Sequence, residues 1–359
     1  MHVSSNRPPH DWGKRTLFVL VLLGVSVGMS VGPSSAVGQD TGAGAFSRLG
    51  FGARGIALGN ALVADYSSDA SPHYNPALLP ATDSQRVSIS AALLSFDREL
   101  QFLEFTAPLG PSAGVGLSFT HAGVSNIDGR DQDGYHTETL STDEFALSLA
   151  FGNRFADWLS VGVALTLYQS NFISAVDPAR GLGVDAGVGV QATDQLYLAG
   201  AVNDLLAKHE WNASAIGGSS HTDRFPVRVR LGASYALHDG RLRLLGEIES
   251  RYTARDRRVR DFIVTTGGPL RRTRTESFLF HDLRGRIGAS YQVIESLTAR
   301  GGVDRIGVGG VSGLRPSAGF GVRQSIGNLD LRLSYTATLE PYVRTLMNTG
   351  TIELFLSGE

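Results

Sequence analysis

The sequence predicts an all-β fold, namely a closed antiparallel 14-stranded transmembrane β-barrel with an irregular N-terminal plug or cap segment. Three observations lead to this prediction. Apolar residues alternate with small or polar residues in short stretches from about Arg86 onward, so each strand has one apolar face. The connections between these stretches alternate between short and long, as they do when strands cross a membrane up and down. The number of stretches is even, as in single-chain bacterial outer-membrane barrels.

The first 38 residues are typical of a cleaved signal peptide. Lys14 and Arg15 precede an uncharged apolar run over residues 16–31, and the small residues Ser34 and Ala36 suit signal-peptidase cleavage. The alternative is an uncleaved membrane anchor, but a run of 16 residues is short for a membrane span. We therefore expect an exported chain in the bacterial outer membrane.

The composition excludes several classes of protein. The chain has no cysteine, which excludes disulfides, thiol chemistry and a lipid-modified cysteine. The net charge of −2 argues against nucleic acid as a partner. The 9 histidines are scattered without metal-ligand spacing, and no nucleophile or phosphate-binding motif lies in a suitable context. We expect no enzymatic activity and no cofactor.

Residues 39–85 do not alternate and are rich in glycine and small side chains, so they form either a periplasmic cap or a plug that enters the barrel. The barrel itself covers residues 86–359. The order of its connections places both termini on the periplasmic side, with the short turns. Within the second stretch, Leu100–Thr106 fits neither register, which suggests a β-bulge. The predicted strands are 86–95, 99–108, 112–123, 142–152, 158–171, 180–192, 195–203, 226–238, 241–253, 278–292, 296–306, 314–325, 328–340 and 350–357.

Charged residues of the later strands share the inward register, where a charge avoids the lipid. A charge on the lipid face near the membrane centre costs roughly 2–4 kcal/mol, so this agreement favours a membrane barrel over a soluble sandwich. The mixed signs suggest a cross-strand ion-pair ladder, either a structural network or an ion-selective pathway. The predicted lumen charge network is Arg228, Arg230, Arg243, Glu247, Glu249, Arg284, Arg286, Arg300, Asp304, Arg323, Asp330, Arg332 and Glu353.

Two predicted loops carry further candidates. In 124–141, Asp128, Asp131 and Asp133 resemble part of a calcium-binding loop, although the distal Glu is missing. The alternative is an exposed loop rich in turns. Between Arg251 and Arg274 lie 8 arginines, which suit contact with lipopolysaccharide phosphates or an acidic partner as well as simple solvation.

The irregular N-terminal segment resembles the opening of the PorV/PorQ family of outer-membrane proteins. The resemblance extends through 126–131 and 145–162, and departs from the family at Leu58, Asn60 and Leu78. The Asn-Pro-Ala part is shared with FadL-type fatty-acid transporters. The motif residues are Gly52, Ala53, Arg54, Gly59, Asn75, Pro76 and Ala77.

This resemblance implies a 14-strand barrel of the FadL-like class and a non-enzymatic docking or shuttle role in type IX protein secretion. The implied partners are secretion-system proteins and their exported substrates, beside outer-membrane lipid and lipopolysaccharide. A FadL-like channel for hydrophobic small molecules is the alternative, and a purely structural barrel is the third. An apolar cavity lined by the N-terminal segment and the upper strands would favour the channel. A lumen filled by ion pairs would count against it.

Overall fold

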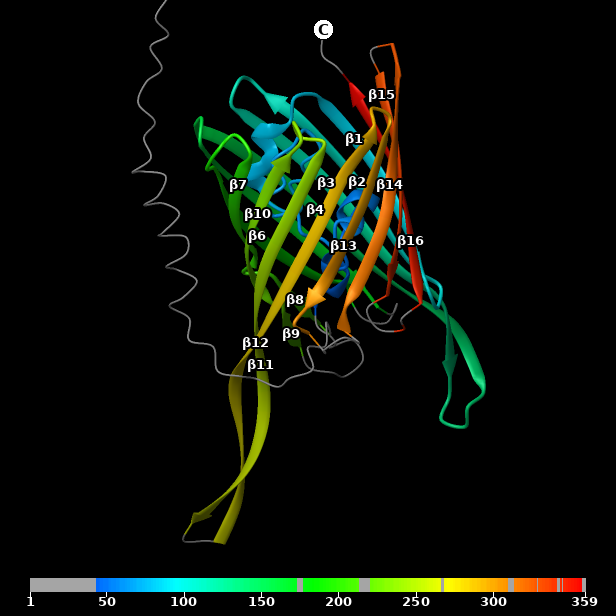
Figure 1. Cartoon of the computed structure of the whole chain (residues 1–359). Coiled ribbons are helices and arrows are strands. Elements are labelled where there is room, and N and C mark those ends of the chain that lie inside the picture. The colour runs from blue at the N-terminus through cyan, green and yellow to red at the C-terminus, as the bar shows by residue number, and fades with distance from the viewer. Residues whose placement is uncertain are drawn as a thin grey trace, which may run out of the picture.

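A computed structural model describes residues 43–356, except 173–176, 213–219, 266–267, 309–312, 328, 341–342 and 344. The predicted signal peptide at 1–38 lies outside the described residues. The chain forms a barrel whose strands run obliquely around an N-terminal segment (Figure 1). No helix among the described residues is long and apolar enough to span a membrane.

One antiparallel sheet of 16 strands makes up the barrel. Two of these strands, β8 and β9, form a short hairpin that joins β6 through a single residue pair, and the other 14 form the wall. The wall is closed because β1 pairs with β16 and β5 pairs with β6. The strands are β1 (Gln85–Leu94), β2 (Arg98–Leu109), β3 (Ala113–Arg130), β4 (His136–Ala156), β5 (Leu159–Asn171), β6 (Ala179–Gln191), β7 (Leu196–Leu205), β8 (Lys208–Trp211), β9 (His221–Arg224), β10 (Val227–Leu237), β11 (Leu242–Thr265), β12 (Gly268–Ile294), β13 (Leu297–Ile306), β14 (Arg315–Ile326), β15 (Leu329–Leu339) and β16 (Leu346–Leu356).

The predicted fold class is confirmed, and each of the 14 predicted wall strands is present. Three connections differ from the prediction. The predicted long connection 204–225 contains the short β8–β9 hairpin. Residues 124–141 and 254–277 are predicted to be long loops, but most of them extend β3–β4 and β11–β12 as hairpins that project beyond the barrel (Figure 1). In the β3–β4 hairpin both faces meet water, so hydrophobic alternation is lost and the sequence pattern does not report the strand.

The wall has an apolar outside and a small or polar inside. On β5, for example, Val163, Leu165 and Leu167 point outward and are exposed, whereas Ala164 and Thr166 point inward and are buried. Large exposed apolar residues recur on the outward face of the other wall strands. Such an outside is unfavourable in water and is expected of a barrel surrounded by lipid.

The bulge predicted in Leu100–Thr106 is wrong, because β2 pairs in regular register with both of its neighbours. Leu103 points outward as an ordinary lipid-facing residue. Phe102 points inward and is also apolar, because its ring stacks on Phe51 of the N-terminal segment at 4.9 Å between centroids. A strand that is covered on both faces shows no clean alternation, and this explains the ambiguous sequence.

Residues 43–84, here called the plug, lie inside the barrel and contain η1 (Ala45–Arg48), α2 (Ala53–Ala57) and η2 (Pro76–Ala81). We call the end of the barrel with short turns the short-turn end and the other the long-connection end. The two ends of the wall pair at the short-turn end, Gln85 with Leu356. The plug begins at the opposite end, where Ala43 packs beside Phe225. The expectation that both termini lie with the short turns therefore holds for the wall strands and not for the first described residues.

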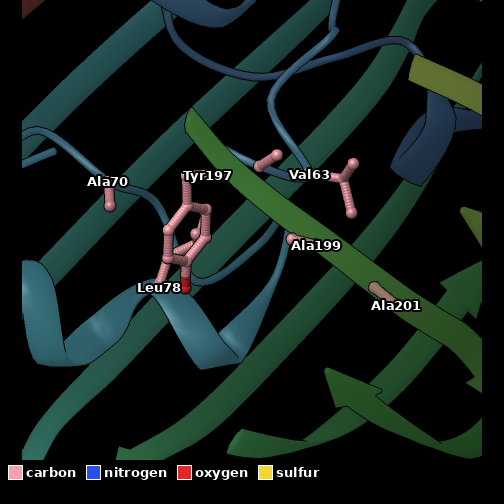
Figure 2. Close-up of a cluster of buried hydrophobic side chains, with 7 residues drawn as sticks. Val63, Ala70, Leu78, Tyr197, Ala199 and Ala201 are labelled. Carbon is pink, nitrogen blue, oxygen red and sulfur yellow. The ribbon is translucent and has the colours of Figure 1, made fainter. Parts of the chain in front are cut away.

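The middle of the plug packs on small side chains of β7. Figure 2 shows Val63 and Leu78 of the plug beside Tyr197, Ala199 and Ala201, all of which are buried. Alanine on the inner face keeps the backbone of β7 close to the plug, so the lumen has little free space at this level.

Strand glycines bring the plug helices even closer to the wall. A Cβ at Gly162 of β5 would lie 2.3 Å from the carbonyl carbon of Pro76, and one at Gly302 of β13 would lie 2.3 Å from the amide nitrogen of Gly59. Neither position has room for a side chain. The two contacts lie on different parts of the wall, so η2 and α2 are each seated against strands that lack side chains at the contact.

Candidate functional site: an aromatic pocket at the end of an ion-paired lumen

The middle of the lumen holds buried ion pairs that connect β10 to β13. Glu247 accepts from both Arg230, at 2.8 Å, and Arg286, at 2.5 Å. Arg286 also pairs with Glu249 at 2.9 Å and with Asp304 at 2.8 Å. All five side chains are less than one-tenth exposed. Alternating charges therefore satisfy one another across four neighbouring strands.

The plug completes this cluster with its backbone. Arg230 donates to the carbonyl oxygens of Tyr74 and Asn60, and the amide of Val63 donates to Glu247 at 3.0 Å. These bonds use further donors of Arg230 and an acceptor of Glu247, and such additional bonds make a buried ion pair tolerable. The plug is thus fixed to the wall through charged groups.

A second cluster holds the plug to the wall on β1, β2, β15 and β16. Arg86 pairs with Glu104 at 2.6 Å and with Glu353 at 3.3 Å, and it donates to the plug carbonyls of residues 69 and 70. Arg332 pairs with the plug carboxylate of Asp69 at 2.5 Å. Two separate parts of the wall are therefore joined through the plug.

The predicted lumen charge network is divided by the structure into three groups. Most members belong to the two buried clusters, and Arg243 reaches the plug through the carbonyl of Tyr66 and the carboxylate of Asp65. Three members are buried with partners outside these clusters, since Arg228 pairs with Asp204, Arg284 pairs with Asp282 and Arg300 donates to Ser334.

Arg323 and Asp330 are the exception to the predicted network. They pair with each other close to the β14–β15 turn, and Arg323 is 51% exposed. The register of a strand gives the side on which a residue lies, but not its height along the barrel axis. The sequence therefore predicts a lumen position for this ion pair, which in the structure lies at the rim of the barrel.

Several lumen charges escaped the sequence analysis. Arg86 stands in the same register as the inward Ser88 and Ser90, so its position was readable. Glu104 was hidden by the irregular pattern of β2. Asp204 is the counterion of Arg228 at 2.9 Å, and it lies at the end of β7 with a positive φ of 61°, where alternation ends.

The motif shared with PorV/PorQ proteins builds the plug. Gly52, with φ of 71°, precedes α2, and Arg54 of that helix pairs with Asp65. Asn75 caps η2 by accepting from the amide of Ala77, and its side-chain amide donates to the carbonyl of Val63 at 2.8 Å. Gly59, Ala53 and Pro76 lie against wall strands. The motif therefore has a structural explanation within this chain.

The weak calcium candidate does not assemble. Asp128 accepts from Arg130 and His136, and Asp131 accepts from the backbone amides of the turn at 133 and 135. The carboxylates of Asp128 and Asp131 therefore serve the tip of the β3–β4 hairpin, where Asp133 is exposed. Across the described parts of the chain, no group of three or more His, Cys, Asp or Glu side chains is arranged to hold a metal ion.

Of the arginine-rich connection, the structure describes the side chains only at its ends. Arg251 pairs with Glu249 inside the lumen, and Arg274 pairs with Glu276 on the projecting hairpin. The side chains of 255–273 lie outside the described set, so the predicted contact with lipopolysaccharide or an acidic partner stays a prediction.

A pocket of about 240 Å³ lies at the long-connection end, where the β8–β9 hairpin meets the barrel mouth. We call it the aromatic pocket. It lies beside a cluster of buried rings in which Phe225 contacts Tyr168 at 4.6 Å and His209 at 4.8 Å between centroids. The residues that line it are Ala43, Glu144, Phe172, His209, Trp211 and Asp223.

Some polar atoms of the aromatic pocket have hydrogen-bond partners and others do not. Trp211 Nε1 donates to Asp223 at 2.9 Å, and Ser170 donates to Glu144 at 3.4 Å. His209 is 1% exposed, and its Nε2 has no hydrogen-bond partner among the described residues. Burial lowers the pKa of His209 to about 4, against the opposing effect of the Asp223 charge. At neutral pH the imidazole is therefore uncharged.

The aromatic pocket is separated from the short-turn end by the charged clusters. Tyr168 donates to Asp204 at 2.7 Å, and Asp204 pairs with Arg228, so the polar lumen begins directly beneath the rings. No candidate of the sequence analysis falls in this pocket. The only signal for it was the cluster of His209, Trp211 and Phe225 in a connection otherwise rich in polar residues.

Solved outer-membrane channels share this fold. The toluene transporter TodX of Pseudomonas putida is 14% identical, matches over 85% of this chain and 96% of its own, and gives a TM-score of 0.57. The monoaromatic hydrocarbon channel CymD is 13% identical over 87% and 98%, with a TM-score of 0.58. A Pseudomonas aeruginosa FadL homologue is 13% identical over 86% and 98%, with a TM-score of 0.54.

At such low identity the likeness establishes the fold alone. Neither a protein-family model nor a curated protein matches the sequence. The FadL-like barrel that the sequence resemblance implied is confirmed, whereas the finer likeness to PorV/PorQ proteins finds no support in these comparisons.

Proposed function

We propose that this protein is an outer-membrane channel that takes up small hydrophobic molecules through the aromatic pocket. The pocket is the observation that carries the proposal. It combines a buried ring cluster with free volume at the end of the barrel, as ligand sites in barrel mouths do. The shared fold with TodX and CymD supports it, since both are described as carriers of monoaromatic compounds.

Capture and passage are separate steps in this proposal. An apolar molecule in the aromatic pocket faces Asp204 and Arg228 and, beyond them, the buried clusters. Inserting it between paired ions would break their contacts without replacing them, which is costly. Passage therefore requires the plug to move away from the wall, whereas capture does not.

An engineered disulfide tests this division. A Cβ at Gly319 of β14 would lie 3.0 Å from the Cβ of Ala57 in α2, slightly closer than the roughly 3.5–4.5 Å of natural disulfides. It would also lie 2.4 Å from Thr336 Oγ1 and 2.5 Å from the carbonyl oxygen of Tyr335, so the wall must shift locally, and the single variant Gly319→Cys measures the effect of that shift. The chain has no cysteine of its own, so the double variant Ala57→Cys, Gly319→Cys forms one possible bond. The oxidised variant is expected to bind 2-phenylethanol in detergent like the wild type and to fail to admit it into proteoliposomes.

Reduction of the disulfide restores uptake if the plug gates passage, and each single cysteine variant is the matched control. Uptake by the oxidised variant would contradict a moving plug. Absence of both binding and uptake in the wild type would leave the purely structural barrel as the better interpretation.

The docking or shuttle role in type IX secretion is a second candidate, which rests on the N-terminal motif. The motif residues act within the plug, where Arg54 and Asn75 hold neighbouring segments, so the motif is accounted for without a secretion partner. Deletion of the gene followed by analysis of secreted proteins tests the role. Loss of substrates with a C-terminal sorting signal would support it, and unchanged secretion would remove it.

A further inference from the structure

The proposed uptake function leaves open which hydrophobic molecules enter, and the chemistry of the aromatic pocket narrows the class. We propose that the pocket selects single-ring aromatic amines, bound as ammonium cations between Glu144, Asp223 and the ring faces. This inference rests on the proposed function. It adds a charge preference that a purely hydrocarbon-binding site would not have.

The volume sets the size of the ligand. A cavity of roughly 150 Å³ accommodates benzene. The aromatic pocket, at about 240 Å³, therefore holds one ring with a short side chain and is small for the drug-sized ligands that fill larger pockets. An arylalkylamine such as 2-phenylethylamine fits this range.

The charge of the residues that line the pocket determines whether a cationic or an anionic ligand is favoured. Among the described residues that line the pocket there are two carboxylates, Glu144 and Asp223, and no lysine or arginine. Among the described residues Glu144 has no ion-pair partner, and its hydrogen bond from Ser170 is long at 3.4 Å. The guanidinium of Arg48 donates to the carbonyl oxygens of residues 43 and 44, and its charge also acts on Glu144 without forming an ion pair. A cationic ligand in the pocket would supply a closer counterion, whereas a carboxylate would be repelled.

The aromatic rings suit the same cation. Phe172 and Trp211 lie 4.9 Å apart at an interplanar angle of 47°, and His209 meets Trp211 edge to face at 5.9 Å. Tryptophan is the best aromatic partner for a cation, and the attraction grows when water is excluded. Rings and carboxylates together form the kind of cage that recognises ammonium groups.

His209 provides a directional contact. Its Nε2 is buried and without a hydrogen-bond partner among the described residues, and the uncharged imidazole can accept a hydrogen bond from an ammonium N–H. A buried polar atom without a partner is costly, so a ligand that completes the hydrogen bond gains affinity. An apolar ligand would leave the same atom unsatisfied.

The test uses the mature full-length protein in detergent and three ligands of one size at pH 7. Titration calorimetry with 2-phenylethylamine, 2-phenylethanol and 3-phenylpropanoate compares cation, neutral molecule and anion. The amine is expected to bind at least about tenfold more tightly than the alcohol, because hydrogen bonds to charged groups exceed neutral ones by roughly that factor. The anion is expected to bind most weakly.

Two variants identify the residues. Glu144→Gln keeps the shape and is expected to lower the affinity for the amine about tenfold while leaving the alcohol unchanged. Asp223→Asn serves as the second variant if the first is poorly folded. Glu138→Gln is the matched control, since this exposed glutamate lies on the same strand beyond the pocket, and it should change neither affinity.

The outcomes separate the two proposals. Equal affinities for amine and alcohol, or an amine affinity that Glu144→Gln and Asp223→Asn leave unchanged, would overturn the charge selection while uptake of hydrophobic molecules stands. Tighter binding of 3-phenylpropanoate would overturn it as well. If none of the three ligands binds, the proposed function itself is wrong.

Discussion

In the middle of the lumen, Glu247 and Glu249 each face more than one guanidinium. At the long-connection end the pocket is lined by Glu144, which forms no ion pair with another described residue, and by His209, whose Nε2 has no hydrogen-bond partner among them. The two regions differ in how far their buried polar groups satisfy one another. The paired groups fix the plug to the wall, and the proposed ligand would satisfy the others. Burial of charge alone thus identifies neither a channel nor a binding site.

The largest expected effect tests the pairing in the middle of the lumen. Glu247→Ala leaves Arg230 and Arg286 buried without their carboxylate and also removes the acceptor of the Val63 amide. The free energy of unfolding is expected to fall by about 3–5 kcal/mol. Chemical denaturation in lipid vesicles measures it.

The control for that variant is Arg323→Ala, which removes an exposed pair from the rim. This substitution is expected to lower the free energy of unfolding by less than about 1 kcal/mol. Equal losses in both variants would show that the buried cluster does not differ from a surface ion pair.

The second prediction concerns the close contact between plug and wall. Gly162→Val would place side-chain atoms against the Pro76 carbonyl and is expected to destabilise the protein by about 1–3 kcal/mol. Gly246→Val is the control, because a Cβ there meets no atom within 4 Å. Thermal unfolding in detergent compares the two, and a loss confined to Gly246→Val would contradict the contact.

The third prediction is a pH dependence that belongs to the plug. Burial and the charges of Arg228 and Arg230 lower the pKa of His73 to about 3 from its usual 6.5, against the opposing effect of Asp204. Unfolding therefore takes up a proton below pH 6.5, and this stability is lost as the pH falls toward 3. At pH 4.5 the loss is expected to be on the order of 2 kcal/mol.

His73→Phe isolates this contribution from the carboxylates, because phenylalanine keeps the ring contact with Phe51 and does not titrate. The variant is expected to lose less stability than the wild type between pH 7 and pH 4.5. If His73→Phe and the wild type lose the same stability between pH 7 and pH 4.5, His73 does not cause the pH dependence.

The smallest expected effect on stability lies at the pocket end. Phe225→Leu weakens the ring contacts with Tyr168 and His209 and is expected to cost about 1 kcal/mol. Affinity for 2-phenylethanol should fall in the same variant, because the ring cluster supports the pocket. A large loss of stability with unchanged binding would contradict this prediction, because the ring cluster would then stabilise the fold and not support the pocket.

Sequence alone predicted the wall well because lipid on one side and a plug or water on the other impose a period of two. It failed where this contrast disappears. The projecting part of β3 at 124–130 alternates poorly because it extends beyond the barrel, and β2 carries apolar residues on both faces, since Leu103 faces lipid and Phe102 contacts the plug. The β8–β9 hairpin is too short to show any period.

The candidate site was harder to predict for a different reason. The inward register correctly grouped Arg230, Glu247 and Arg286, since they lie on neighbouring strands at similar height. The aromatic pocket joins Ala43 of the plug, Glu144 of β4 and Trp211 of β8, which are distant in sequence and follow no common pattern. Only the folded topology brings them together.

The pairing of Gln85 with Leu356 has a consequence for how the molecule is made. The first wall strand finds its second neighbour only when the last strand of the chain has arrived, so closure depends on contacts of the longest sequence separation and is slow. Because Arg86 and Arg332 reach the preceding residues from both sides of that seam, we expect those residues to enter the interior before the wall closes. The N-terminal segment would then be the surface on which the wall is completed.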